Sequence, residues 1–107
     1  MLEYGLIDQL KDLGWHVIFD GQMQSFKRLK PASDDNIGRM KKPRYVSAVC
    51  KEVADICHGH AKQKRLVLTL GGDHSIAMGT ISGTARAYDD FCVVWVDAHA
   101  VTHPISQ

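Results

Sequence analysis

One stretch of this sequence, Leu66 to His99, limits the folds that the chain can adopt. It contains two short, almost unbroken apolar runs, Leu66–Leu70 and Phe91–Val96, separated by a segment with helical spacing. Apolar runs of this length on either side of a helix are typical of strands in a parallel sheet that is covered on both faces. The stretch therefore predicts an α/β fold built around a parallel sheet.

Residue types that bind metal ions follow both runs. His74 comes after the first run, and Asp97 and His99 come after the second. Ligands of open α/β sheets bind beyond the carboxyl ends of the strands, so these three side chains are expected to converge. Imidazole and carboxylate together suit Mn, Fe or Zn, and an oxygen-rich set favours Mn. Taken singly, each also has an ordinary structural interpretation as a strand-end turn, a cap or a loop residue.

The rest of the chain alternates between helix and strand patterns. Apolar spacing predicts three helices, and Pro43 is well placed as the first residue of the second; they cover residues 2–13, 43–60 and 75–88. Residues 15–19 predict one more strand, and residues 22–42 form a long loop with no clean period. Gly79 and Gly83 weaken the third helix intrinsically, so their expected use is close approach of that helix to the sheet.

Composition excludes several classes of function. The chain of 107 residues suits one small domain, and its net charge of +1 selects no partner. Seven of the 13 basic residues lie between Lys27 and Arg44, but acidic residues interrupt them and no aromatic side chain is interleaved, so a solvated loop is favoured over a nucleic-acid patch. No segment has the features of a signal peptide or the length of a membrane span. Three cysteines without a CxxC pair favour a reducing, cytoplasmic environment.

Other candidate sites have simpler interpretations. The run Cys57-His58-Gly59-His60 has no second cluster at ligand spacing, so a helix end with surface histidines is favoured over a zinc site. Gly71-Gly72 precedes a helix, but Asp73 would repel a phosphate there. The three cysteine and two tryptophan side chains are interpreted as core residues: Cys50, Cys57, Cys92, Trp15 and Trp95.

Two motifs at their observed spacing are far more specific than any single residue. Gly71-Gly72-Asp73-His74-Ser75 after one strand, and Val96-Asp97-Ala98-His99 after the next, resemble the ureohydrolase superfamily. The longer runs Leu70–Gly83 and Val94–His99 resemble arginases in particular, and Leu6–Gly21 is less specifically similar. The resemblance covers Leu6 to Ala100, with a variable loop in the middle.

The resemblance implies hydrolysis of L-arginine to L-ornithine and urea by two manganese ions bridged by a hydroxide, on a three-layer αβα sheet. His74 matches a ligand of one ion, Asp97 a carboxylate that bridges both, and His99 a ligand of the other. Asp73 has no ligand role in the family pattern, so support of the loop is its expected part. The resemblance assigns no catalytic or substrate-binding residue within this chain.

The departures from the family pattern predict an incomplete site. A second aspartate expected two positions after His99 is replaced by Val101, and His103 is a poor substitute because Pro104 argues against a helix there. Three of the six protein ligands of the family are matched. Residues 1–107 are therefore interpreted as a truncated arginase-like domain, inactive alone, with a divergent tail at 101–107. The three predicted strands would be the second, third and fourth of the family sheet, no two of which are neighbours.

Two alternatives remain open. Within the superfamily, the alternative assignment is agmatinase, another ureohydrolase. A non-catalytic protein that associates with a second copy of itself or with a full-length relative is the alternative of a different class, because unpaired strands invite association.

Overall fold

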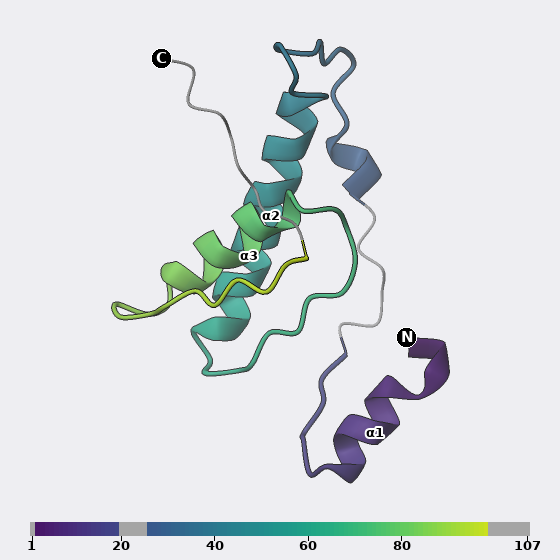
Figure 1. Ribbon diagram of the computed structural model, residues 1–107, viewed down its shortest axis with the longest axis vertical. Helices are drawn as coiled ribbons and strands as arrows, with labels where there is room; N and C mark the ends of the chain where they lie inside the picture. The colour runs from purple at the N-terminus through teal and green to yellow at the C-terminus, as the bar shows by residue number, and fades with distance from the viewer. Residues whose placement is uncertain (1, 20–25, 99–107) are drawn as a thin grey trace.

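The computed structural model describes residues 2–19 and 26–98, and its regular elements there are helical (Figure 1). The elements are the 3-10 helices η1 and η2 and the α-helices α1, α2 and α3, with bounds Leu2–Tyr4 for η1, Phe26–Leu29 for η2, Leu6–Asp12 for α1, Pro43–Ala61 for α2 and Ile76–Ala85 for α3. The three predicted helices are thus confirmed, with the first and the third shorter than expected. No helix among these residues is both long and apolar enough to cross a membrane.

Helix α2 is the longest element, and its start is set by groups from the preceding loop. Pro43 occupies the first turn, where its missing N–H leaves no bond unmade. The Asp34 carboxylate accepts hydrogen bonds from the backbone N–H groups of Arg44, at 3.1 Å, and Tyr45, at 2.8 Å. These are N–H groups that a helix cannot satisfy internally, and a carboxylate beside them also complements the helix dipole. Part of the predicted long loop therefore serves as a cap.

The core lies between α2 and α3, which lie side by side in Figure 1. Its buried apolar side chains all come from one face of α2, namely Val53, Ala54, Cys57 and Ala61. Opposite them, α3 buries Gly79 and Gly83. A Cβ at Gly79 would lie 2.9 Å from Val53 Cβ, and one at Gly83 would lie 2.8 Å from Cys57 Cβ. The glycines do permit close approach, but to helix α2 rather than to a sheet as predicted.

Polar contacts at the edges of this helix pair hold its register. Arg86 Nη1, just past the end of α3, lies 2.6 Å from Asp55 Oδ1 on α2. The Tyr88 hydroxyl donates to the Ala61 carbonyl at 3.2 Å, across the carboxyl end of α2. Ion pairs with exposed partners add little stability in water, so burial of the α2 face is the main stabilising term here.

The predicted parallel sheet is wrong for the part of the chain that the structure describes. The segments 15–19, 66–70 and 91–96 form no strand, and the one ladder contact is an isolated antiparallel bridge between Ile37 and Met40. A strand exists only through hydrogen bonds to a neighbouring strand. None of the three segments pairs with another among the described residues, so none of them forms a strand there.

Without a sheet, the apolar runs remain largely open to solvent. Leu66 is 77% exposed, Val94 83% and Val96 93%, whereas buried strands of a covered sheet would hide such side chains. The Cα radius of gyration is 16.4 Å, against about 13 Å for a compact domain of this length.

Candidate functional site

His74 lies on the turn that leads into α3. Gly71 and Gly72 adopt φ values of 103° and 77°, in a region that residues with a side chain rarely occupy, so the turn needs glycine at both positions. His74 comes two residues after Gly72, and its carbonyl accepts a hydrogen bond from the Ala77 N–H at 3.3 Å as the helix begins. The local sequence therefore fixes the backbone beneath the His74 imidazole.

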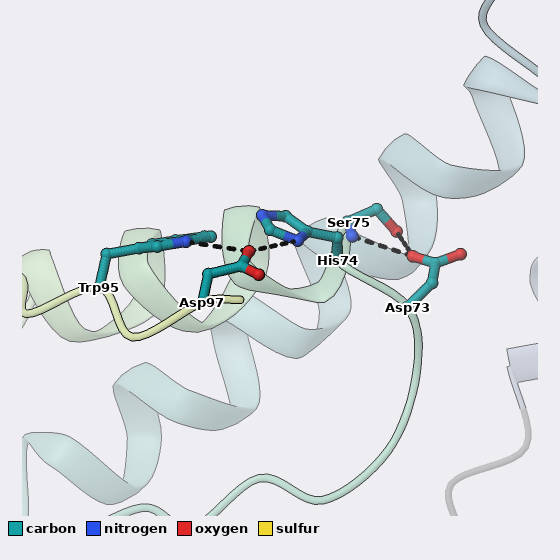
Figure 2. A network of polar contacts seen from close by, with 5 residues as sticks. All are labelled: Asp73, His74, Ser75, Trp95 and Asp97. Atoms are coloured by element: carbon teal, nitrogen blue, oxygen red, sulfur yellow. Dashed lines mark hydrogen bonds and ion pairs between the residues drawn. The ribbon is translucent and has the colours of Figure 1, made fainter. Parts of the chain in front are cut away.

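Asp73 stabilises the same turn from its own side chain. Its Oδ1 accepts hydrogen bonds from the Ser75 N–H at 2.9 Å and from the Ser75 hydroxyl at 2.5 Å (Figure 2). This is the i to i+2 bonding that aspartate makes in turns. The predicted role of Asp73 in supporting the loop is thereby confirmed.

The segment 91–98, which follows α3, brings Asp97 to His74. Asp97 Oδ2 lies 3.6 Å from His74 Nδ1, with the Asp97 side chain 16% exposed and the His74 side chain 55% exposed. The two residues are separated by helix α3 in sequence, and Figure 2 shows their polar groups pointing toward one another. Two of the three predicted ligand positions therefore meet even though no sheet carries them.

Trp95 joins this pair, although the sequence analysis interpreted it as a core residue. Its indole Nε1 donates to Asp97 Oδ2 at 3.4 Å, and its ring centroid lies 4.8 Å from that of His74 at an interplanar angle of 37°. The side chain is 49% exposed, so the core interpretation is wrong. The signal that could have found it is its position two residues before Asp97, because side chains two apart on an extended backbone share a face.

The third predicted ligand, His99, lies outside the described residues. Within residues 2–19 and 26–98, no group of three His, Cys, Asp or Glu side chains is placed to hold a metal ion. His74 and Asp97 fit as two members of such a group, because ligand atoms lie about 2.0–2.2 Å from an ion such as zinc and a 3.6 Å separation lets both reach one centre. The carboxylate is an oxygen ligand of the kind that suits manganese, and the imidazole is a ligand of the kind that suits zinc or iron.

The cysteines do not contribute to this pair. Cys57 is buried in the α2 face, and burial raises the pKa of its thiol, so the group stays protonated and packs as a small apolar side chain. Cys50 is half-buried, and its thiol lies 3.3 Å from the Ser75 carbonyl. Cys92 is exposed, so its predicted burial is wrong. All three cysteines are free thiols.

The Asp73 turn is expected to open in acid. Hydrogen bonds from the Ser75 hydroxyl and then the Ser75 N–H lower the pKa of Asp73, so this turn is more stable above the ordinary carboxyl pKa and loses that stability as pH falls through the lowered value. The Ser75 amide resonance, followed by NMR from about pH 7 to about pH 2, should shift with a midpoint below about 3.9. Asp73→Asn should abolish the transition and Asp35→Asn should leave it in place; a transition that persists in Asp73→Asn would contradict the assignment.

Comparisons with known proteins agree on one family. The family model described as the arginase family matches residues 4–107. Curated relatives include the arginase of Glaciozyma antarctica, 48% identical over 101 residues, which cover 94% of this chain and 29% of the relative. The arginase of Coccidioides posadasii is 49% identical over 106 residues, covering 94% of this chain and 33% of the relative. The hepatic arginase of Aquarana catesbeiana is 42% identical over 104 residues, with 96% and 31% covered.

The chain thus spans about a third of the length of the curated relatives that it matches. No solved structure gives a significant match.

Proposed function

Because this chain belongs to the arginase family, we propose that it supplies the first part of a manganese site that hydrolyses L-arginine to L-ornithine and urea. The observation that carries the proposal is the approach of His74 to Asp97, at 3.6 Å between Nδ1 and Oδ2. The family motifs supply these two residues, and the described part of the chain brings them together without a sheet. A cytoplasmic location is part of the proposal, since all three cysteines are free thiols.

His74 and Asp97 are the described residues that would hold the metal, with His99 as the third proposed ligand. Bound manganese would supply a Lewis acid that lowers the pKa of water and balances charge developing on the substrate. The chain's own contribution is orientation: the turn fixed by Asp73 and Ser75 sets the His74 backbone, and the extended segment sets Asp97.

The 107 residues alone are proposed to be inactive. Matches to three of the family's six protein ligands are present in the sequence, so a binuclear site would need ligands that this sequence does not match. An assay of urea release from L-arginine with manganese should accordingly give no turnover by the chain alone.

Manganese binding is expected to depend on His74. Titration of Mn²⁺ into the 107-residue chain by calorimetry should show weak binding, and His74→Ala should weaken it by at least about tenfold, because even groups behind the ligands are worth 10–100-fold in affinity. The exposed imidazole of His16, in the segment 15–19, offers a matched control, and His16→Ala should leave the titration unchanged. An identical titration curve for His74→Ala would remove the proposed site.

A second candidate function is association with another arginase-family chain. The observation that favours it is the exposure of apolar side chains along 66–70 and 91–96, including Leu68 at 60% and Val93 at 50%. Extended segments with unpaired backbone groups can add to the sheet of another chain. Co-purification with a full-length relative, together with no His74-dependent manganese binding, would favour this candidate over the first.

A further inference from the structure

We propose that Trp95 is a positioning residue that fixes the orientations of Asp97 and His74 and thereby sets their affinity for manganese. The inference rests on the function proposed above and assigns a part to a residue outside the predicted ligand set. The inference is based on one indole side chain that contacts both members of the pair, Asp97 through its N–H and His74 through its ring (Figure 2).

The indole N–H acts on the carboxylate. Rotation about the terminal torsion of an aspartate is broad and nearly two-fold, so an unrestrained carboxylate samples many orientations. Trp95 Nε1 lies 3.4 Å from Asp97 Oδ2, and the same oxygen lies 3.6 Å from His74 Nδ1. At 3.4 Å the hydrogen bond is long, so its effect is to select a rotation more than to add binding energy. The oxygen that it selects is the one that faces the imidazole.

The indole ring acts on the imidazole. The terminal torsion of a histidine is equally broad, and the His74 side chain is 55% exposed, so solvent alone would leave the ring free to turn. The Trp95 ring packs against it with centroids 4.8 Å apart and an interplanar angle of 37°. Aromatic pairs at this separation prefer defined relative orientations. The contact therefore limits the directions in which Nδ1 can point.

The positions of these residues explain why one side chain can reach both groups. Trp95 and Asp97 are two apart in the sequence, and Trp95 Nε1 lies 3.4 Å from Asp97 Oδ2. His74 comes from the turn before α3, and its Nδ1 lies 3.6 Å from the same Asp97 oxygen. Groups that contact a metal ligand and orient it, without binding the metal themselves, commonly change metal affinity by 10–100-fold. The expected contribution of Trp95 lies at the lower end of that range because its side chain is 49% exposed.

Two substitutions separate the N–H from the ring. Trp95→Phe keeps an aromatic face and removes the donor, and Trp95→Leu removes both. In the 107-residue chain, calorimetry with Mn²⁺ should give about tenfold weaker binding for Trp95→Phe and a larger loss for Trp95→Leu. Trp15→Phe is the matched control, because Trp15 is similarly exposed, at 53%, on a different segment, and it should bind manganese like the unmodified chain. Far-UV circular dichroism should show the same helix content in all of them, because Trp95 lies outside the α2 core.

NMR provides a readout that does not involve the metal. Ring-current shifts of the His74 ring protons should be retained in Trp95→Phe and in Trp15→Phe, and should collapse in Trp95→Leu. Unchanged His74 shifts in Trp95→Leu, or unchanged manganese affinity in both Trp95 variants, would overturn the inference. Loss of binding in His74→Ala with no loss in the Trp95 variants would overturn it while leaving the proposed function intact. No binding by the unmodified chain would overturn the proposed function, and the affinity role of Trp95 with it.

Discussion

Substitution of Gly83 by leucine is expected to separate α3 from α2 and to remove cooperative unfolding of the chain. Even the Cβ of a new side chain would lie 2.8 Å from Cys57 Cβ and would press on the Ala54 carbonyl, which belongs to the α2 backbone and cannot rotate away. Leucine would gain about 1 kcal/mol in helix propensity over glycine. Overpacking of a tight contact costs about 1–3 kcal/mol, and separation of the helices would also expose the α2 face, so destabilisation dominates.

The measurement is urea unfolding followed by far-UV circular dichroism, with Gly59→Ala as the control. Gly59 is exposed within the same helix pair, on α2, and a Cβ there would meet no atom within 4 Å. Gly59→Ala should therefore raise the unfolding free energy by about 0.5–1 kcal/mol, since only the backbone entropy changes. A Gly83→Leu chain as stable as the unmodified one would show that α2 and α3 do not pack in solution as described.

Loss of the Asp97 carboxylate should abolish arginine hydrolysis in a full-length setting. Residues 4–100 of this chain would replace the aligned segment of the Coccidioides posadasii arginase, to which this chain is 49% identical. Such a chimera is expected to release urea from L-arginine with manganese. Asp97→Ala within it should lower the rate by about 100-fold or more, because loss of a proposed metal ligand should exceed the 10–100-fold effect of losing a group that only orients a ligand.

Asp90→Ala in the same chimera is the matched control. This substitution also removes one carboxylate, from the exposed turn before the segment 91–96 and away from His74. It should therefore leave the rate of urea release unchanged. An active Asp97→Ala chimera would contradict the assignment of Asp97. A chimera that folds but releases no urea would contradict the proposal that this segment supports arginine hydrolysis.

Part of the candidate site could be predicted from the sequence. The loop role of Asp73 was predicted because it depends on one short motif. The approach of Asp97 to His74 was also predicted, although it was expected at the edge of a sheet that the described residues do not form. Trp95 was missed because an aromatic residue inside an apolar run has the composition of a core strand. Only the absence of a covering sheet reveals that this side chain is half exposed and free to contact the pair.

Some features of this protein follow from local sequence patterns, and others depend on tertiary contacts. The sequence by itself determined the three helices and the family, because helix hydrogen bonds and motif spacing lie within short segments. The tertiary structure decided that the apolar runs form no sheet, since a strand depends on a partner distant in sequence and a run of apolar residues cannot specify one. It also decided that Gly79 and Gly83 meet a helix, because a missing side chain permits close approach without choosing what approaches.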